Sequence, residues 1–180
     1  MRQDARENRE RILAAAEKVF GAYGGAGSTE EVARRAGVGI ATVFRHFATK
    51  EELIDAALLR HLDQLTERAE ALTLDTDRSV AWQTLLRTMI ETGATKLTLA
   101  STLDDHGRLP RSVATASNRL KAAVAAVLLQ AQEAGVVRPS VTVEEVYLLI
   151  RGLAQATATM PVQPATLDRA ISVVLTGLSR

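Results

Sequence analysis

The chain has 180 residues, of which 47% are hydrophobic and 24% charged, so it can bury a core and is not intrinsically disordered. Its formal net charge of +1 gives no global signal for nucleic-acid binding, and any such signal must be local. The absence of cysteine excludes disulfides and thiolate metal sites, and no two of the three histidines have the spacing of metal ligands. We predict neither a metal site nor a cofactor.

The N-terminal segment MRQDARENRERI is charged and has no apolar centre, which excludes a signal peptide. No apolar run approaches the roughly 18 residues of a membrane span. We therefore expect a soluble, cytoplasmic protein. Helical spacing of apolar residues predicts a first helix over residues 4–23.

Residues 28–50, STEEVARRAGVGIATVFRHFATK, have the pattern of two short helices joined by a tight turn. Ser28 and Glu31 have the spacing of a capping box, in which the hydroxyl and the carboxylate each accept a backbone N–H. Gly37 stops the first helix, and a second helix is predicted over 39–47. A small residue, a glycine and a branched residue at this spacing are typical of a helix-turn-helix.

No Asp or Glu occurs from residue 32 to residue 50, whereas four Lys or Arg side chains and one histidine do. A local cationic patch on a nearly neutral chain is expected of a phosphate-binding surface. The alternative is a solvated basic face on a structural hairpin. We favour the first interpretation because the acid-free run coincides with the hairpin.

The remaining chain is predicted to be helical, and no segment has a strand pattern, so the predicted fold is all-α. The further helices are expected over residues 49–72, 78–100, 110–134, 143–159 and 165–178. A polar break at 73–77 marks the neighbourhood of the domain boundary, and residues 101–109 are predicted to be polar and irregular. The helix over 143–159 is apolar nearly all round, which favours a core behind it and a second subunit in front of it.

The segment AGVGIATVFRHFATKEELI, preceded by RILAAAEKVFGAYG, resembles the DNA-binding domain of TetR-type transcriptional regulators. The resemblance covers the first third of the chain, and the remainder has the helical layout of the family's ligand-binding domain. Three features depart from the family pattern, and one of them is the unusually glycine-rich connector, residues 24–27. Gly39 stands where the family usually has Ser or Thr as the helix cap, and Ile40 stands where it often has Lys or Arg.

The resemblance implies a three-helix helix-turn-helix domain, residues 1–52, and a helical effector-binding and dimerisation domain, residues 53–180. It also implies a homodimeric repressor that binds double-stranded DNA at a palindromic operator and is released by a small-molecule effector. We expect no enzyme, because the sequence has no nucleophile elbow, phosphate loop or informative carboxylate pair. The alternative is a ligand-binding or interaction module that has lost DNA binding, for which Gly39 and Ile40 are the suspect changes.

The resemblance implies that one set of side chains on the second hairpin helix and just after it faces DNA. These are Thr42, Phe44, Arg45, His46 and Lys50. In the family the aromatic residue, the following histidine and the lysine contact phosphates. Phe44 replaces the commoner tyrosine, so its contact is expected to be apolar. From their chemistry, Thr42 suits a base edge, and Ile40 and Ala41 suit thymine methyl groups. Arg45 suits either guanine or a phosphate, and we favour the phosphate.

The effector site is predicted from helical spacing in the second domain, where most such residues are simply core. The candidates are Trp82, Leu86, Met89, Leu103, His106, Leu120, Val124 and Tyr147. Because only Trp82 and Tyr147 are aromatic there, an aliphatic effector is favoured over a flat dye. Asp104, Asp105 and His106 are interpreted as a solvated turn, with a polar lid or a weak metal site as the alternative.

Overall fold

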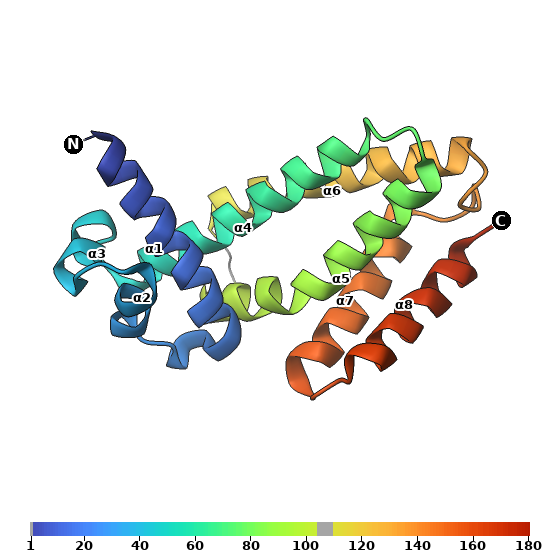
Figure 1. Ribbon diagram of the computed structural model, residues 1–180. Coiled ribbons are helices and arrows are strands. Elements are labelled where there is room, and N and C mark those ends of the chain that lie inside the picture. Colours follow the sequence, from blue (N-terminus) through green and yellow to red (C-terminus); the bar gives the residue numbers. More distant parts are fainter. Residues whose placement is uncertain (1, 104–109) are drawn as a thin grey trace. The chain divides into compact units, whose positions relative to one another are not determined.

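The computed structural model describes residues 2–103 and 110–180, and within these ranges it contains eight α-helices and one 3-10 turn (Figure 1). The elements are α1 (Arg2–Tyr23), η1 (Gly24–Ala26), α2 (Thr29–Ala36), α3 (Ile40–His46), α4 (Lys50–Leu72), α5 (Arg78–Leu103), α6 (Arg111–Glu133), α7 (Val143–Thr159) and α8 (Pro164–Leu178). The predicted all-α fold is confirmed. In the described ranges the only β-type backbone pairing is an isolated antiparallel bridge between Val137 and Ser179. Asp104, Asp105 and His106 lie outside the described residues.

The end of α5 corrects one expectation, because the predicted irregular segment begins three residues too early. The helix continues to Leu103. The hydroxyls of Ser101 and Thr102 both donate to the Thr98 carbonyl, at 2.9 Å each. These two polar residues therefore bond back onto the preceding helical turn and do not break it.

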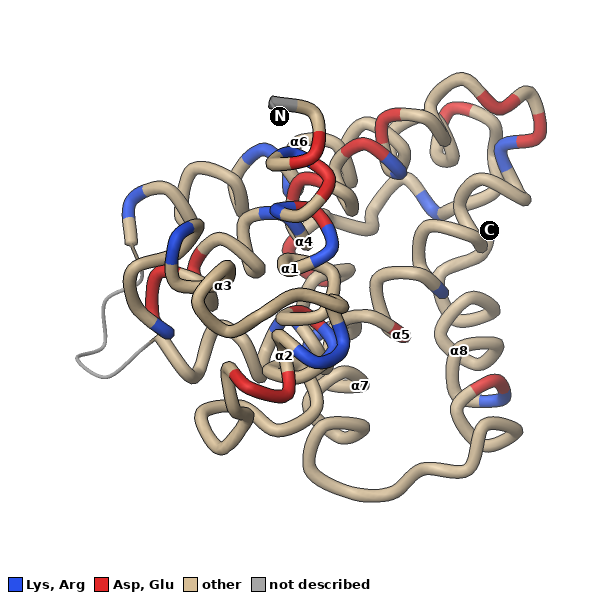
Figure 2. Tube along the Cα trace, turned by 60° about the vertical axis from the view of Figure 1, so that its left-hand side comes forward, with Lys and Arg blue, Asp and Glu red and all other residues tan. Residues whose placement is uncertain are grey.

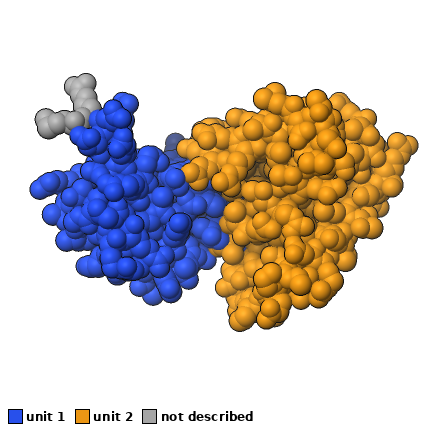
Figure 3. All heavy atoms as spheres, viewed as in Figure 1, with its two compact units in different colours: residues 1–62, 95–114 blue, residues 63–94, 115–180 orange. Residues whose placement is uncertain are grey.

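The chain forms two compact units (Figure 3). Unit 1 contains residues 1–62 and 95–114, and unit 2 contains residues 63–94 and 115–180. The helix α4 contributes its first part to unit 1 and its last part to unit 2. The boundary between residues 52 and 53 stays a prediction.

Unit 1 is built around α1, whose apolar face is buried against the hairpin and α4. Ile12, Val19 and Phe20 are fully buried, as are Phe47 and Leu53 from the later elements. Burying side chains of this size stabilises by about 1.5–3 kcal/mol each. This core holds the hairpin in place, so that its outer side chains are presented on a firm support.

A buried polar cluster joins α1 to α4 in unit 1. The Glu17 carboxylate accepts from Arg60 Nη1 at 2.8 Å and lies 2.7 Å from His61 Nδ1. Burial by itself raises the pKa of Glu17, but hydrogen bonds and charges from His61 and Arg60 outweigh it and lower that pKa from its ordinary 4.5. His61 is 4% exposed, and its Nδ1 is partnered by Glu17.

We expect Glu17→Gln to lower the free energy of unfolding at pH 7 by about 2 kcal/mol, because it removes the carboxylate that the mostly buried Arg60 and His61 share. Since the folded pKa lies below 4.5, this stabilisation is present above pH 4.5 and is lost as the pH falls through the folded value. Urea denaturation at pH 7 and at lower pH measures both effects. Glu10→Gln is the control, because Glu10 also pairs with Arg60 but is 62% exposed. Equal losses from both variants would contradict the assignment.

Unit 2 contains a close approach of two helices at Gly93. A Cβ atom added at Gly93 would lie 2.6 Å from the Ala154 Cβ. Such a separation is too short for two carbon atoms, so only glycine lets α5 pack this closely against α7. Gly93 is thus a contact point.

The helix α7 begins with a complete capping box. Thr142 Oγ1 accepts from the Glu145 N–H at 3.2 Å, and Glu145 accepts from the Thr142 N–H at 2.7 Å. Val146, Ile150 and Ala154 are buried in unit 2. The opposite face is exposed on this chain, with Leu148 72% accessible. One face of the apolar helix therefore packs in the core and the other is open.

Candidate DNA-binding site

The helix α2 starts where the sequence predicts, but its capping box is only half formed. Ser28 Oγ accepts from the Glu31 N–H at 3.1 Å. The Glu31 carboxylate does not return to Ser28. It instead accepts from Arg34 Nε and Nη2 and from Arg35 Nε, at 2.6–2.8 Å. Hydrogen bonds from these two arginines lower the pKa of Glu31 to about 2. The expected reciprocal cap is therefore wrong.

This ion-pair cluster changes the electrostatics of the predicted cationic patch. Acidic residues begin α2 and basic residues end it, and Figure 2 shows this order along the tube. Because Glu31 sits three and four residues before the arginines, one carboxylate serves both. Arg34 and Arg35 are thus partly neutralised, and the less compensated charge lies further along, on α3.

The turn between α2 and α3 depends on Gly37, which adopts a left-handed conformation with φ 66° and ψ 37°. The Val38 N–H donates to the Ala33 carbonyl at 3.1 Å, closing the end of α2. Side chains other than glycine are strained in this region of φ and ψ. The turn fixes the angle at which α3 leaves α2, as the helix-turn-helix pattern predicts.

The helix α3 is seven residues long and presents most of its side chains to solvent. Only Val43 is buried, with Phe47 buried just after the helix. Ile40 and Phe44 are 37% and 46% exposed, one helical turn apart. Ala41 and Arg45 are exposed, whereas Thr42 and His46 are intermediate. Two exposed apolar side chains beside an exposed arginine are therefore available for contacts with a partner.

Gly39 caps α3 without a side chain. It has an extended backbone, φ −70° and ψ 149°, and its carbonyl accepts from the Thr42 N–H at 2.8 Å. No atom lies within 4 Å of a Cβ added at this position. The departure from the family's Ser or Thr cap therefore removes one hydrogen bond but leaves the helix start intact.

Lys50 has a partner that sequence spacing does not reveal. Its Nζ donates to the Gly25 carbonyl at 2.7 Å and lies 5.5 Å from the centre of the Phe20 ring. Lys50 thus ties the glycine-rich connector to the start of α4. A lysine ammonium has three donors, so this contact leaves capacity for a phosphate. Its role in phosphate contact stays a prediction.

The start of α4 and the N-terminal half of α1 complete the surroundings of α3. Thr49 Oγ1 accepts from the Glu52 N–H at 3.1 Å, and Glu52 accepts from the Ala48 N–H at 2.8 Å. The Arg9 guanidinium lies over the Phe47 ring, 5.0 Å from its centre. A cation here was not predicted, because α1 and the hairpin meet only in the folded chain.

The candidate effector residues fall into different environments. Five are buried in unit 2: Trp82, Leu86, Met89, Leu120 and Val124. Tyr147 is half-buried in unit 2 and Leu103 half-exposed in unit 1, while His106 lies outside the described residues. The Trp82 Nε1 and the Tyr147 hydroxyl are buried without a partner in the described chain, and burial raises the pKa of Tyr147. Of these residues only Met89 lines an open groove of unit 2.

The described ranges, residues 2–103 and 110–180, contain neither a candidate metal site nor a candidate membrane-spanning helix. No group of three or more His, Asp or Glu side chains in those ranges is arranged to hold a metal ion. No helix there combines the length and the apolar character that a membrane crossing requires.

The hairpin of α2 and α3 packs one side in a core and exposes its second helix, and further helices follow it in the chain. This is the arrangement of a helix-turn-helix transcriptional regulator. The family model described as "Bacterial regulatory proteins, tetR family" matches residues 12–57. A second family model, described as "Transcriptional regulator SbtR-like, C-terminal domain", matches residues 77–180. The chain belongs to the TetR family of transcriptional regulators, with an SbtR-like C-terminal domain.

Solved structures and curated relatives agree with this family. A TetR transcription regulatory protein from Mycobacterium vanbaalenii is 30% identical over 99% of both chains, with a TM-score of 0.80. A TetR transcriptional regulator from Streptomyces coelicolor is 29% identical over 95% of this chain and 98% of the other, with a TM-score of 0.82. An HTH-type transcriptional regulator of Staphylococcus aureus (strain USA300) is 41% identical over 64 residues, 35% of each chain. This chain thus spans about a third of the curated relatives it matches.

Proposed function

We propose that the protein is a dimeric repressor that binds a palindromic operator and releases it when a small molecule binds the C-terminal helices. The observation that carries the proposal is α3, which exposes Ile40, Phe44 and Arg45 above buried Val43 and Phe47. A helix of this kind is suited to the major groove, where base edges can be distinguished. The proposed effector domain is residues 53–180, with DNA contacts confined to residues 1–52.

Each exposed side chain of α3 has a role in this proposal. Ile40 and Ala41 contact thymine methyl groups, and Thr42 bonds a base edge. Arg45, His46 and Lys50 contact phosphates, which fixes the position of the helix on the duplex. Phe44 packs against the backbone without a hydrogen bond. The weak cap at Gly39 leaves backbone N–H groups at the start of α3 available to a phosphate.

Dimerisation is proposed through α7 and α8, which are joined by residues 160–163 and run in opposite directions (Figure 1). Their open faces carry exposed apolar side chains, Leu148 at 72% and Val173 at 71%. Gly152 and Gly177 have open space beside them, which allows close helix approach. A second copy would cover this surface and place two α3 helices at one operator.

Effector binding is proposed for unit 2. The buried Trp82 N–H and the Tyr147 hydroxyl lack partners in the described chain, and a ligand with an acceptor atom would satisfy them. A ligand that fits only the DNA-free arrangement lowers the affinity of the protein for its operator. Because the coupling is reciprocal, the operator lowers the affinity for the ligand by the same factor.

Selection of random duplexes with the purified protein, followed by sequencing and footprinting, tests the proposal. We expect a palindrome protected on both half-sites, with affinity that falls steeply as salt rises. No enriched sequence, and no specific binding to the DNA upstream of its own gene, would favour the module that has lost DNA binding.

Phe44→Tyr is expected to tighten operator binding about fivefold, because the added hydroxyl supplies the phosphate hydrogen bond that phenylalanine lacks, about 1 kcal/mol. Phe44 is 46% exposed, so the hydroxyl causes no burial penalty. Fluorescence anisotropy with the selected operator measures the change. Unchanged operator affinity in the variant would mean that Phe44 does not contact the DNA backbone.

A further inference from the structure

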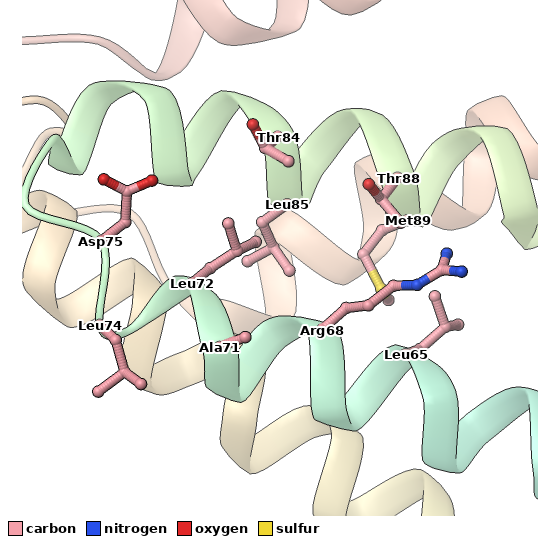
Figure 4. Close-up of a pocket in the computed structure, with 10 residues that line it drawn as sticks. All are labelled: Leu65, Arg68, Ala71, Leu72, Leu74, Asp75, Thr84, Leu85, Thr88 and Met89. Carbon is pink, nitrogen blue, oxygen red and sulfur yellow. The ribbon is translucent and has the colours of Figure 1, made fainter.

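An open groove lies between the end of α4 and the first half of α5, entirely within unit 2 (Figure 4). Its volume is about 480 Å³, enough for a small organic molecule. The lining residues are Leu65, Arg68, Ala71, Leu72, Leu74, Asp75, Thr84, Leu85, Thr88 and Met89. Of the predicted effector residues it contains only Met89, so it is a different site from the one that helical spacing suggested.

The floor of the groove is apolar and fixed. Leu65, Leu85 and Met89 are buried core residues whose side chains form its base. The turn that closes one end is held by Arg78 NH1, which donates to the Thr73 carbonyl at 3.0 Å and also to the Asp75 carbonyl. A rigid apolar base requires little reorganisation when a ligand binds.

The mouth of the groove is unusually apolar for a surface turn. Leu74 is 84% exposed although it stands between polar residues of the connection. Exposed leucine on a turn gains nothing in folding, but it would be covered by an aliphatic ligand lying in the groove. Leu65 and Leu72 are seven residues apart on α4, which makes the apolar wall about 10 Å long.

Arg68 supplies the one cation among the lining residues. Figure 4 shows its side chain lying along the groove below Met89, with the guanidinium at the end away from Asp75. No hydrogen bond or ion pair engages this guanidinium within the described part of the chain, whereas Asp75 Oδ1 accepts from the Asp77 N–H at 2.9 Å. The groove therefore offers an apolar trough with an unused cation at one end.

We propose that this groove binds a monoanion with an aliphatic tail, such as a medium-chain carboxylate, its anionic group on Arg68 and its tail over Leu72, Leu85 and Met89. A guanidinium recognises a carboxylate with two parallel N–H donors, and the tail buries apolar surface. The role of this ligand as effector rests on the proposed function. The groove lies on the part of α4 in unit 2, and the same helix begins beside α3 in unit 1.

Titration of the full-length protein with decanoate tests the groove directly. Labelling methionine methyl groups with carbon-13 gives a local probe, because Met89 lines the groove and Met160 does not. We expect a saturable shift of the Met89 signal. Decanol, which keeps the tail, and decyltrimethylammonium, which reverses the charge, should bind at least tenfold more weakly.

Three variants separate the groove from the rest of the surface. Arg68→Gln should weaken decanoate binding on the order of tenfold. Ala71→Trp, at an exposed position, should fill the groove and abolish binding without disturbing the core. Arg180→Gln removes the same charge at an exposed site outside the groove and should leave binding unchanged. No saturable shift, or equal binding of decanol and decanoate, would overturn the proposal.

The effector role has its own readout. Decanoate should weaken binding of the selected operator by wild-type protein and much less in Arg68→Gln. If decanoate shifts Met89 but leaves operator affinity unchanged, the ligand class stands and its role as effector is refuted. If no DNA is bound by any form, the proposed function fails while the result on the groove still decides the ligand class.

Discussion

Ile40→Glu should reduce specific operator binding by at least a hundredfold without unfolding the protein. Ile40 is the first residue of α3 and is 37% exposed, so the replacement does not place a charge in the core. Glutamate at the first turn is also favourable for the helix itself. The loss therefore reports on DNA alone.

The size of the effect follows from charge. A carboxylate brought into a groove flanked by phosphates loses water and meets like charges, which costs several kcal/mol. Every 1.4 kcal/mol is a factor of ten in affinity. Removing the thymine contact alone, as in Ile40→Ala, should cost much less, about tenfold.

Val80→Glu is the matched control for Ile40→Glu. Val80 is an exposed aliphatic residue in the first turn of α5, in unit 2, and 51% of it is accessible. The same change of charge there should leave operator binding within about twofold. The proposal confines DNA contacts to residues 1–52, and salt screens the interaction between exposed charges over about 10 Å. Anisotropy titrations at one salt concentration compare the two variants. Equal losses would mean that net charge, and not α3, controls binding.

Local signals in the sequence explain why the helices were predicted well. Thr142 and Glu145 form their capping box from residues three apart, and Gly37 ends α2 through its own backbone preference. The error at Ser101 and Thr102 has a local cause too. Hydroxyls can either break a helix or bond back onto it, and composition does not distinguish the two.

The predicted site was less complete because its electrostatics depend on neighbours. Counting acids from residue 32 onward omitted Glu31, whose helical spacing to Arg34 and Arg35 did carry the signal. The partner of Lys50 is the Gly25 carbonyl, 25 residues away, and no spacing rule relates them. Arg68 was not predicted as a ligand-binding residue, because helical periodicity identifies buried apolar faces. The groove that Arg68 lines forms only where α4 and α5 come together in the fold.

Leu148→Glu should convert the proposed dimer into a monomer and lower full-operator affinity by a hundredfold or more. Leu148 lies on the open face of α7, 72% exposed, so the isolated chain tolerates a polar residue there. In a dimer the same position would be covered, and an unpaired buried carboxylate costs several kcal/mol. Sedimentation velocity measures the change of mass at the concentrations used for binding.

The loss of DNA affinity in Leu148→Glu follows from the dimer and not from the contacts of α3. Two linked half-site contacts exceed one by about 10²- to 10⁴-fold, because the second forms at high effective concentration. Affinity for a single half-site should therefore be the same in the variant and the wild type. Val173→Glu on α8 should behave alike. Leu129→Glu, at a leucine of α6 that is 54% exposed, should keep both the dimer and the operator affinity. A variant that stays dimeric and yet loses operator would show that α7 acts through the fold of unit 2, and the second copy would have to be sought on another face.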